Sequence, residues 1–311
     1  MAIDKQNKKK EPDISVTIGK IKMKNPVMVA SGTFGYGQEY ADLVDLNKLG
    51  AVVVKGINFA GCKGNPTPRM VEVPSGIVNS IGLQGPGVEK FIRDYMSFFD
   101  NYKVPVIVNI WGRDINEYTT VASKLNDVPH VSGLELNVSC PNVKEGGAAF
   151  GTNRKILEKI VKQTRQASSL TLIVKLAPNV SNIAEFARIC ESEGADAVSL
   201  INSYPAMVID IEKRRPVLAN KTGGLSGPAI HPIAVKLVWE TARSVNIPVV
   251  GMGGIFSAKD ALEFIIAGAT AVAVGTANFT DPSISLSVVD GISEYLRRHN
   301  IPSIKKLIGS L

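Results

Sequence analysis

The stretch IPVVGMGGIFSAKDALEFIIAGATAVAVGT, residues 247–276, decides the fold. An apolar run ends in GMGG, a segment of helical period follows at 257–269, and a second apolar run ends in VGT. Runs that are apolar at nearly every position are typical of strands buried on both faces, as in parallel sheets. The stretch therefore predicts two parallel strands joined by a helix, with a glycine turn after each strand.

The same pattern recurs along the whole chain. Further apolar runs lie at 27–32, 51–56, 104–112, 131–140, 170–178 and 195–203, and segments of helical period lie at 153–167 and 182–194. Eight strands that alternate with helices predict an α/β fold, the TIM (β/α)₈ barrel. A doubly wound open sheet is the alternative, but it more often stops at five or six strands. The 311 residues suit one barrel of about 250 residues with insertions.

Residues 14–25, ISVTIGKIKMKN, predict a β-hairpin around Gly19 that closes the bottom of the barrel. We expect one barrel domain over 14–311, preceded by a disordered basic tail over 1–13 with lysines at 5, 8, 9 and 10. A nucleic-acid or membrane anchor is the alternative interpretation of the tail. No aromatic residues alternate with these lysines, so the sequence favours a solvated tail and predicts no nucleic-acid partner.

Composition excludes several classes of function. No apolar run approaches the roughly 20 residues that span a bilayer, so we expect no membrane association. The cysteines, Cys62, Cys140 and Cys190, are too few and too far apart for a disulfide framework or a metal site, which favours a reducing cytoplasm. The three histidines lie at 130, 231 and 299 and form no cluster with acidic residues. The pattern excludes a hydrolase triad and predicts no metal.

Polar residues or glycines end all eight predicted strands. Because the carboxyl ends of barrel strands meet at one mouth, these residues are expected to converge there. Lysine and asparagine are costly to bury without partners, so their presence at strand ends indicates a ligand site. They are Ser31, Lys55 with Gly56, Asn109, Asn137 with Cys140, Lys175, Asn202 with Ser203, Gly253 with Gly254, and Gly275 with Thr276.

The glycines after the last two strands indicate an anion site. Barrels commonly bind phosphate there through backbone N–H groups, and glycine lets the backbone approach the anion closely. A glycine-rich turn at 223–230, GGLSGPAI, precedes the next helix and adds possible donors. The chain carries neither a Walker A pattern nor a strand–GxGxxG–helix fingerprint. The sequence therefore predicts a phosphate-bearing cofactor in a barrel mouth.

Lys175 and Lys55 supply fixed positive charge to that mouth. A salt bridge to a nearby carboxylate is the alternative role for each lysine, but few carboxylates lie at these strand ends. Cys140 follows the fourth strand in NVSCPNVKEGGAAFG, a glycine-rich loop on the same face. Such a thiol is a candidate acid/base if a positive or donor-rich setting lowers its pKa. Cys190, within a predicted helix, is expected to be a small core residue.

Seven motifs carry a family resemblance that covers residues 14–311. ASGTFGYG, NSIGLQGPG, NVSCPNVKEGG, VKLAPNV, GGLSGPAI, GMGGI and VGTAN, in this order and spacing, resemble class 1 dihydroorotate dehydrogenase. NVSCPNVK followed by GG, and Gln84 after IGL, are similar to the 1B branch rather than the fumarate-using 1A branch.

The resemblance implies an FMN enzyme that oxidises dihydroorotate to orotate in pyrimidine synthesis. It implies that Cys140 removes the C5 proton while C6 delivers hydride to the flavin. The implied substrate site is Lys55, Asn79, Ser80, Ile81, Gly82, Leu83, Asn137, Asn202 and Ser203. The implied FMN site is Ser31, Lys55, Gly56, Asn109, Asn137, Lys175, Ile201, Gly227, Gly253, Gly254, Gly275 and Thr276.

The 1B resemblance further implies a partner subunit that carries FAD and a [2Fe–2S] cluster and passes electrons to NAD⁺. It implies a homodimer of this chain at the centre of a heterotetramer. The alternatives are a fumarate-using 1A enzyme, a relative of dihydropyrimidine dehydrogenase, and a non-enzymatic phosphate- or nucleic-acid-binding protein. Two positions depart from the family pattern: Gly85 replaces an asparagine, and Ser203–Tyr204–Pro205 replaces a threonine followed by small or aliphatic residues.

Overall fold

Eight parallel strands close into a barrel in the computed structural model, which describes residues 11–138 and 147–311. The predicted fold class is confirmed. Each predicted apolar run forms one strand, and the order around the barrel is β10-β15-β16-β3-β4-β7-β8-β9. The strands are β3 (Val27–Val29), β4 (Ala51–Ile57), β7 (Val106–Ile110), β8 (Val131–Asn137), β9 (Thr171–Lys175), β10 (Ala197–Leu200), β15 (Val249–Met252) and β16 (Ala271–Val274).

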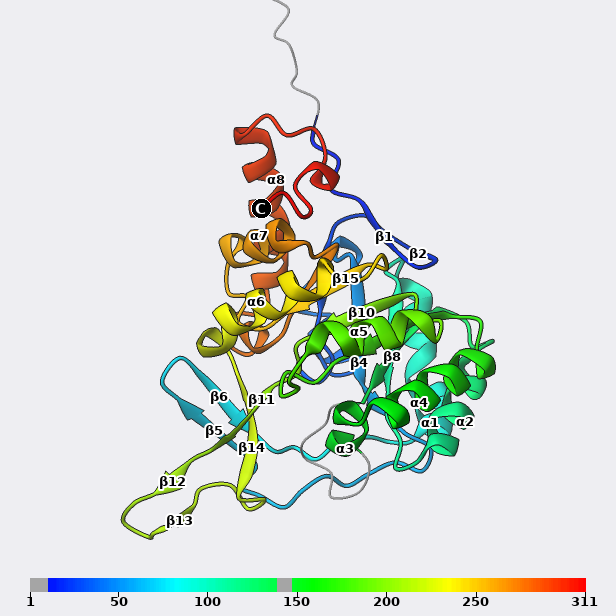
Figure 1. Ribbon diagram of the computed structural model, residues 1–311, viewed down its shortest axis with the longest axis vertical. Helices are drawn as coiled ribbons and strands as arrows, with labels where there is room; N and C mark the ends of the chain where they lie inside the picture. The colour runs from blue at the N-terminus through cyan, green and yellow to red at the C-terminus, as the bar shows by residue number, and fades with distance from the viewer. Residues whose placement is uncertain (1–10, 139–146) are drawn as a thin grey trace, which may run out of the picture.

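Helices surround the barrel (Figure 1). Several begin at a side chain that accepts a backbone N–H of the first turn: Asp114, Asn153, Asn182 and Ser257. Cys190 is fully buried in α5, as predicted. The helices are α1 (Val88–Tyr95), α2 (Ile115–Leu125), α3 (Gly147–Thr152), α4 (Arg154–Ala167), α5 (Ile183–Ser192), α6 (His231–Ala242), α7 (Ala258–Ala267) and α8 (Ile284–Arg298). Short 3₁₀ helices lie at 38–40, 46–48, 96–101, 228–230, 276–279 and 304–306.

The predicted hairpin covers the amino-terminal end of the barrel. Strands β1 (Val16–Ile18) and β2 (Ile21–Met23) pair antiparallel. The backbone N–H of Lys20 donates to the Thr171 hydroxyl at 3.0 Å, at the start of β9. Gly19 has a φ of +53°, and a Cβ there would lie 2.7 Å from the Thr171 methyl group. Glycine is therefore required where the turn meets the barrel.

A second sheet stands beside the opposite end of the barrel, in the order β11-β14-β6-β5 (Figure 1). Its strands are β5 (Met70–Val73), β6 (Gly76–Asn79), β11 (Tyr204–Met207) and β14 (Thr222–Ser226), and the hairpin of β12 (Ile209–Asp210) and β13 (Arg215–Pro216) extends beyond it. The predicted turn at 223–230 is wrong in its first half. GGLS belongs to β14 because it pairs with both β11 and β6, and the turn starts at Gly227.

Asp13, which the sequence placed in the tail, pairs with the carboxyl-terminal segment. The N–H of Asp13 donates to the Pro302 carbonyl at 3.0 Å, and the N–H of Ile304 donates to the Asp13 carbonyl at 2.9 Å. Residues 1–10 lie outside the described residues. No helix of the described residues is both long enough and apolar enough to cross a bilayer.

Candidate active site

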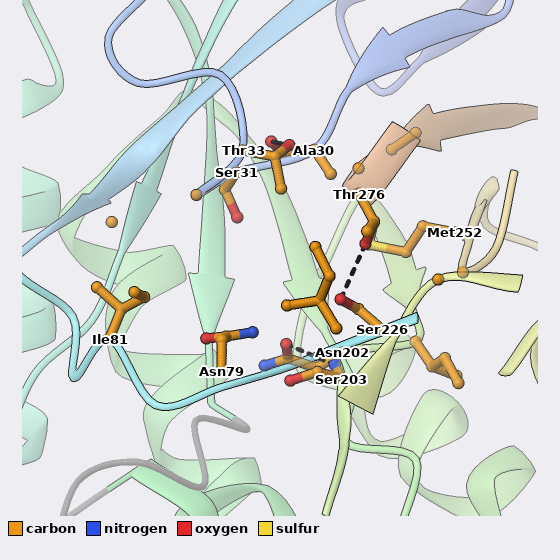
Figure 2. A pocket seen from close by; sticks show the side chains of 18 of the residues that line it. Ala30, Ser31, Thr33, Asn79, Ile81, Asn202, Ser203, Ser226, Met252 and Thr276 are labelled. Atoms are coloured by element: carbon orange, nitrogen blue, oxygen red, sulfur yellow. Dashed lines mark hydrogen bonds between the residues drawn. The ribbon is translucent and has the colours of Figure 1, made fainter. Parts of the chain in front are cut away.

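A cavity of about 370 Å³ lies where the carboxyl ends of the barrel strands meet the second sheet. Figure 2 shows Ser31 and Thr33 on one side of it, Asn79, Asn202 and Ser203 on another, and Ser226, Met252 and Thr276 on a third. The structure brings together most of the residues proposed from the sequence. These are Ser31, Lys55, Gly56, Asn79, Ile81, Gly82, Leu83, Asn109, Asn137, Lys175, Ile201, Asn202, Ser203, Gly227, Gly253, Gly254, Gly275 and Thr276.

Glycine turns form the wall between β15, β16 and the start of α6. Gly253 and Gly254 have φ values of +129° and +69°, in the region that favours glycine. A Cβ on Gly254 would lie 2.9 Å from the Gly227 carbonyl oxygen, so the two turns approach too closely for a side chain. Thr276 donates its hydroxyl to the Ser226 hydroxyl at 2.8 Å (Figure 2). Backbone and hydroxyl donors thus converge on a space that suits a phosphate group.

A buried polar cluster lies under the cavity at the ends of β7, β8, β9 and β10. The sheet register places Asn109 beside Glu135, and Lys175 beside both Asn137 and Ser199. Glu135 accepts hydrogen bonds from Asn109 Nδ2 at 2.6 Å and from the Ser199 hydroxyl at 2.9 Å, and its carboxylate lies 4.0 Å from Lys175 Nζ. The expectation that Lys175 lacks a nearby carboxylate was wrong, because Glu135 points into the barrel from β8.

Positive charge also lies on the side of the cavity near β5. Lys55 and Arg69 both line the cavity, and Arg69 Nη2 donates to Gln84 Oε1 at 2.6 Å. Burial lowers the pKa of the Lys55 ammonium below its ordinary value, and the nearby Arg69 guanidinium lowers it further. An anionic ligand in contact with Lys55 would stabilise its ammonium form and offset both effects on the pKa. Lys55 and Arg69 together therefore favour a carboxylate or another anion.

Amide and hydroxyl groups complete the same side of the cavity. Asn202 Nδ2 lies 3.5 Å from Asn137 Oδ1, and the Ser203 backbone N–H donates to Asn202 Oδ1 at 2.8 Å. Ser203 packs against bare backbone, because a Cβ on Gly224 would lie only 1.9 Å from the Ser203 hydroxyl oxygen. This set of donors and acceptors suits a planar ring with several carbonyl and N–H groups.

Of the described residues proposed from the sequence, Ser80 does not line this cavity. Ser80 is fully buried and lies outside the lining; its N–H donates to the Arg69 carbonyl at 2.8 Å, and its carbonyl accepts from Asn65 Nδ2 at 2.9 Å. Through these two hydrogen bonds, the Ser80 backbone holds the 65–69 segment in place. Cys140 lies outside the described residues, just beyond the end of β8.

Gly85, which departs from the family pattern, is explained by close packing. It exchanges backbone hydrogen bonds with Cys62, and a Cβ at this position would lie 2.9 Å from the Gly56 carbonyl oxygen. The backbone leaves little room for a side chain beside the loop that contains Leu83.

Sequence reasoning missed part of the lining. Arg69, Met70 and Ile77 belong to the long connection between β4 and α1, and its place after a barrel strand was the available signal. Ser226 lies within the GGLSG motif that was interpreted as a source of backbone donors. Ile230 ends the GGLSGPAI motif, and the remaining lining residues lie at or near predicted strand ends: Ala30, Gly32, Thr33, Met252, Ala273 and Phe279.

The fold and cavity define a (β/α)₈-barrel enzyme with its ligand site at the carboxyl ends of the strands. The dihydroorotate dehydrogenase family matches residues 13–296, and the chain belongs to this family. It is 52% identical over 301 residues to the "Dihydroorotate dehydrogenase B (NAD(+)), catalytic subunit" of Geotalea uraniireducens, covering 97% of this chain and 99% of the relative. It is 51% identical to the protein of the same description from Bacteroides fragilis (96% and 99% covered) and 52% identical to that from Porphyromonas gingivalis (95% and 97%).

Proposed function

We propose that the chain is the catalytic subunit of an NAD⁺-linked dihydroorotate dehydrogenase, which oxidises (S)-dihydroorotate to orotate in de novo pyrimidine biosynthesis. The relatives carry this description over nearly their full length. The observation that carries the proposal is the cavity itself. It combines glycine turns suited to a phosphate with a side of lysine, arginine, amide and hydroxyl groups suited to an anionic pyrimidine.

The cavity residues fit FMN. The turns at Gly227, Gly253, Gly254 and Gly275, with Thr276, would hold the phosphate, because their backbone approaches too closely for larger residues at Gly227 and Gly254. Ser31, Gly56, Asn109, Asn137, Lys175 and Ile201 would hold the ring system, with Lys175 compensating negative charge at its pyrimidine end. Bound FMN supplies the hydride acceptor.

The opposite side of the cavity would hold dihydroorotate. Lys55 would pair with the substrate carboxylate, while Asn79, Asn137, Asn202 and Ser203 would hydrogen-bond the ring, and Ile81, Gly82 and Leu83 would cover it. Cys140 would take the C5 proton as the general base. Its place directly after β8 and the family resemblance support this role, since Asn137 at the end of β8 lines the cavity.

Electrons would leave through a partner subunit that carries FAD and a [2Fe–2S] cluster and reduces NAD⁺. The description "catalytic subunit" of the relatives supports a separate electron-transfer subunit. Within the described residues, no group of three or more His, Cys, Asp or Glu side chains could hold a metal ion. We propose a homodimer of this chain at the centre of a heterotetramer, in the cytoplasm.

The test uses the purified chain and its spectrum. We expect a yellow protein that dihydroorotate bleaches and dihydrouracil does not. Bleaching by dihydrouracil would contradict the substrate and favour a relative of dihydropyrimidine dehydrogenase. NAD⁺ reduction is expected only after co-expression with the partner subunit. Efficient fumarate reduction by the chain alone would place it in the 1A branch.

The base is tested with Cys140→Ser. The variant should keep bound FMN while flavin reduction by dihydroorotate slows by at least about 100-fold, because an alcohol is a much weaker base. The matched control is Cys62→Ser: the Cys62 thiol lies 3.5 Å from the Gly82 carbonyl oxygen, and a serine hydroxyl can keep that hydrogen bond, so this variant should reduce its flavin within a few-fold of the wild-type rate. Stopped-flow absorbance measures both. A wild-type rate in Cys140→Ser would remove this residue from the mechanism.

A further inference from the structure

His231, the first residue of α6, lies directly behind the glycine turn at the end of β15. Its Nδ1 is 3.1 Å from the Gly253 carbonyl oxygen, and its Nε2 is 3.0 Å from Glu263 Oε2 on α7. The imidazole is only 12% exposed and packs edge-on against Phe264 at 5.2 Å. One side chain thus connects α6, α7 and the turn.

The hydrogen bond to Gly253 fixes the orientation of a peptide group. A carbonyl oxygen can only accept, so Nδ1 carries the proton and donates. In a trans peptide, the carbonyl of Gly253 and the N–H of Gly254 point in opposite directions. Since His231 holds the carbonyl on the outer side, the N–H of Gly254 points toward the cavity that both glycines line. Among the described residues, no backbone hydrogen bond from the Gly254 N–H to another protein group occurs in the turn.

Glu263 holds the other side of the ring. Its Oε2 lies 3.0 Å from Nε2, so the imidazole is held at both nitrogens. The packing leaves little freedom, because a Cβ on Gly254 would lie 2.7 Å from the His231 Cβ.

We propose that His231 is a positioning residue for the phosphate group of the flavin: it holds the Gly253–Gly254 peptide so that the Gly254 N–H is directed at the phosphate. The inference rests on the proposed function, since it takes FMN as the ligand. It assigns a role to a side chain that does not itself line the cavity.

The experiment compares FMN with riboflavin, which lacks the phosphate. The variants are His231→Asn, His231→Gln and His231→Leu. An asparagine amide reaches the place of Nδ1 and can donate to Gly253, whereas a glutamine amide extends to the place of Nε2. Flavin is removed, and the affinity of each apoprotein is measured by quenching of flavin fluorescence. His299→Asn is the matched control, since His299 lies after α8 and stacks on Tyr295.

We expect the Gln and Leu variants to bind FMN about tenfold more weakly, the effect of losing one well-placed hydrogen bond. The Asn variant should stay within about threefold of wild type, and riboflavin affinity should be equal in all of them. Equal losses for FMN and riboflavin, or no loss in any variant, overturn the inference while leaving the proposed function intact. A wild-type apoprotein that binds neither flavin overturns both.

Discussion

Lys55 should give orotate binding a distinctive pH dependence. Its pKa is lowered by burial and by Arg69, so the free protein loses this proton below the ordinary lysine pKa of 10.5. The ammonium form pairs with the carboxylate, so affinity should be flat at neutral pH and fall as pH rises through the lowered pKa. Titration of the flavin spectrum with orotate between pH 7 and 10.5 measures this.

Lys55→Met provides the control for that pH dependence. Lys55→Met should bind orotate weakly and with little change over the alkaline range. The effect of Lys55 on folding has the opposite sign. Between the lowered pKa of the folded protein and the ordinary lysine pKa, the unfolded chain binds more protons, so the free energy of unfolding rises with pH. An affinity for orotate that stays constant up to pH 10.5 in the wild type would show that Lys55 does not hold the carboxylate.

Glu135 should be a large contributor to stability. Glu135→Ala leaves the buried Lys175 ammonium without its carboxylate and leaves Asn109 and Ser199 without their acceptor. Removing one partner of a buried pair costs about 3–5 kcal/mol of the free energy of unfolding. Glu135→Gln keeps one acceptor and should cost less.

Urea denaturation of the apoproteins checks this ranking. The control is Glu158→Ala on the exposed face of α4, which should change the free energy of unfolding by less than about 0.5 kcal/mol. If Glu135→Ala were as stable as Glu158→Ala, the polar cluster beneath the cavity would not contribute to the free energy of unfolding.

At the scale of elements, the contact between β11 and β14 should control substrate affinity. Pro205 lies opposite Gly224, and a Cβ on Gly224 would lie 1.9 Å from the Ser203 hydroxyl oxygen. Gly224→Ala must therefore displace Ser203, and overpacking of this kind costs about 1–3 kcal/mol. We expect orotate affinity to fall by about tenfold or more while FMN content is unchanged.

Thr222→Ala is the control, since Thr222 is exposed at the start of the same strand. Orotate titrations and flavin-to-protein ratios of both variants provide the measurement. Equal orotate affinity in Gly224→Ala and Thr222→Ala would mean that Ser203 does not contact the substrate.

The sequence predicted the barrel well because its strands are buried on both faces, and this burial appears as continuous apolar runs such as AVVV at 51–54. The second sheet could not be predicted this way. Its strands are short, and β14 contains two glycines whose pairing depends on segments far away in the chain. Glu135 was missed for a related reason: a single acidic residue in an apolar strand gives no sign of which way it points.

At the scale of the whole molecule, the basic amino terminus should be dispensable for catalysis. Asp13 already pairs with the segment at 302–304, so the chain is anchored at this point without residues 1–10. A chain that lacks residues 1–10 should keep its FMN content and its rate of flavin reduction within about twofold. Loss of activity would favour the alternative that the basic segment is the functional part.

The hairpin of β1 and β2 gives the barrel a closed floor, and the proposed flavin and substrate sites share the cavity at the other end. On the proposed function, the flavin and the substrate would therefore both have to enter and leave from the carboxyl-terminal side of the barrel.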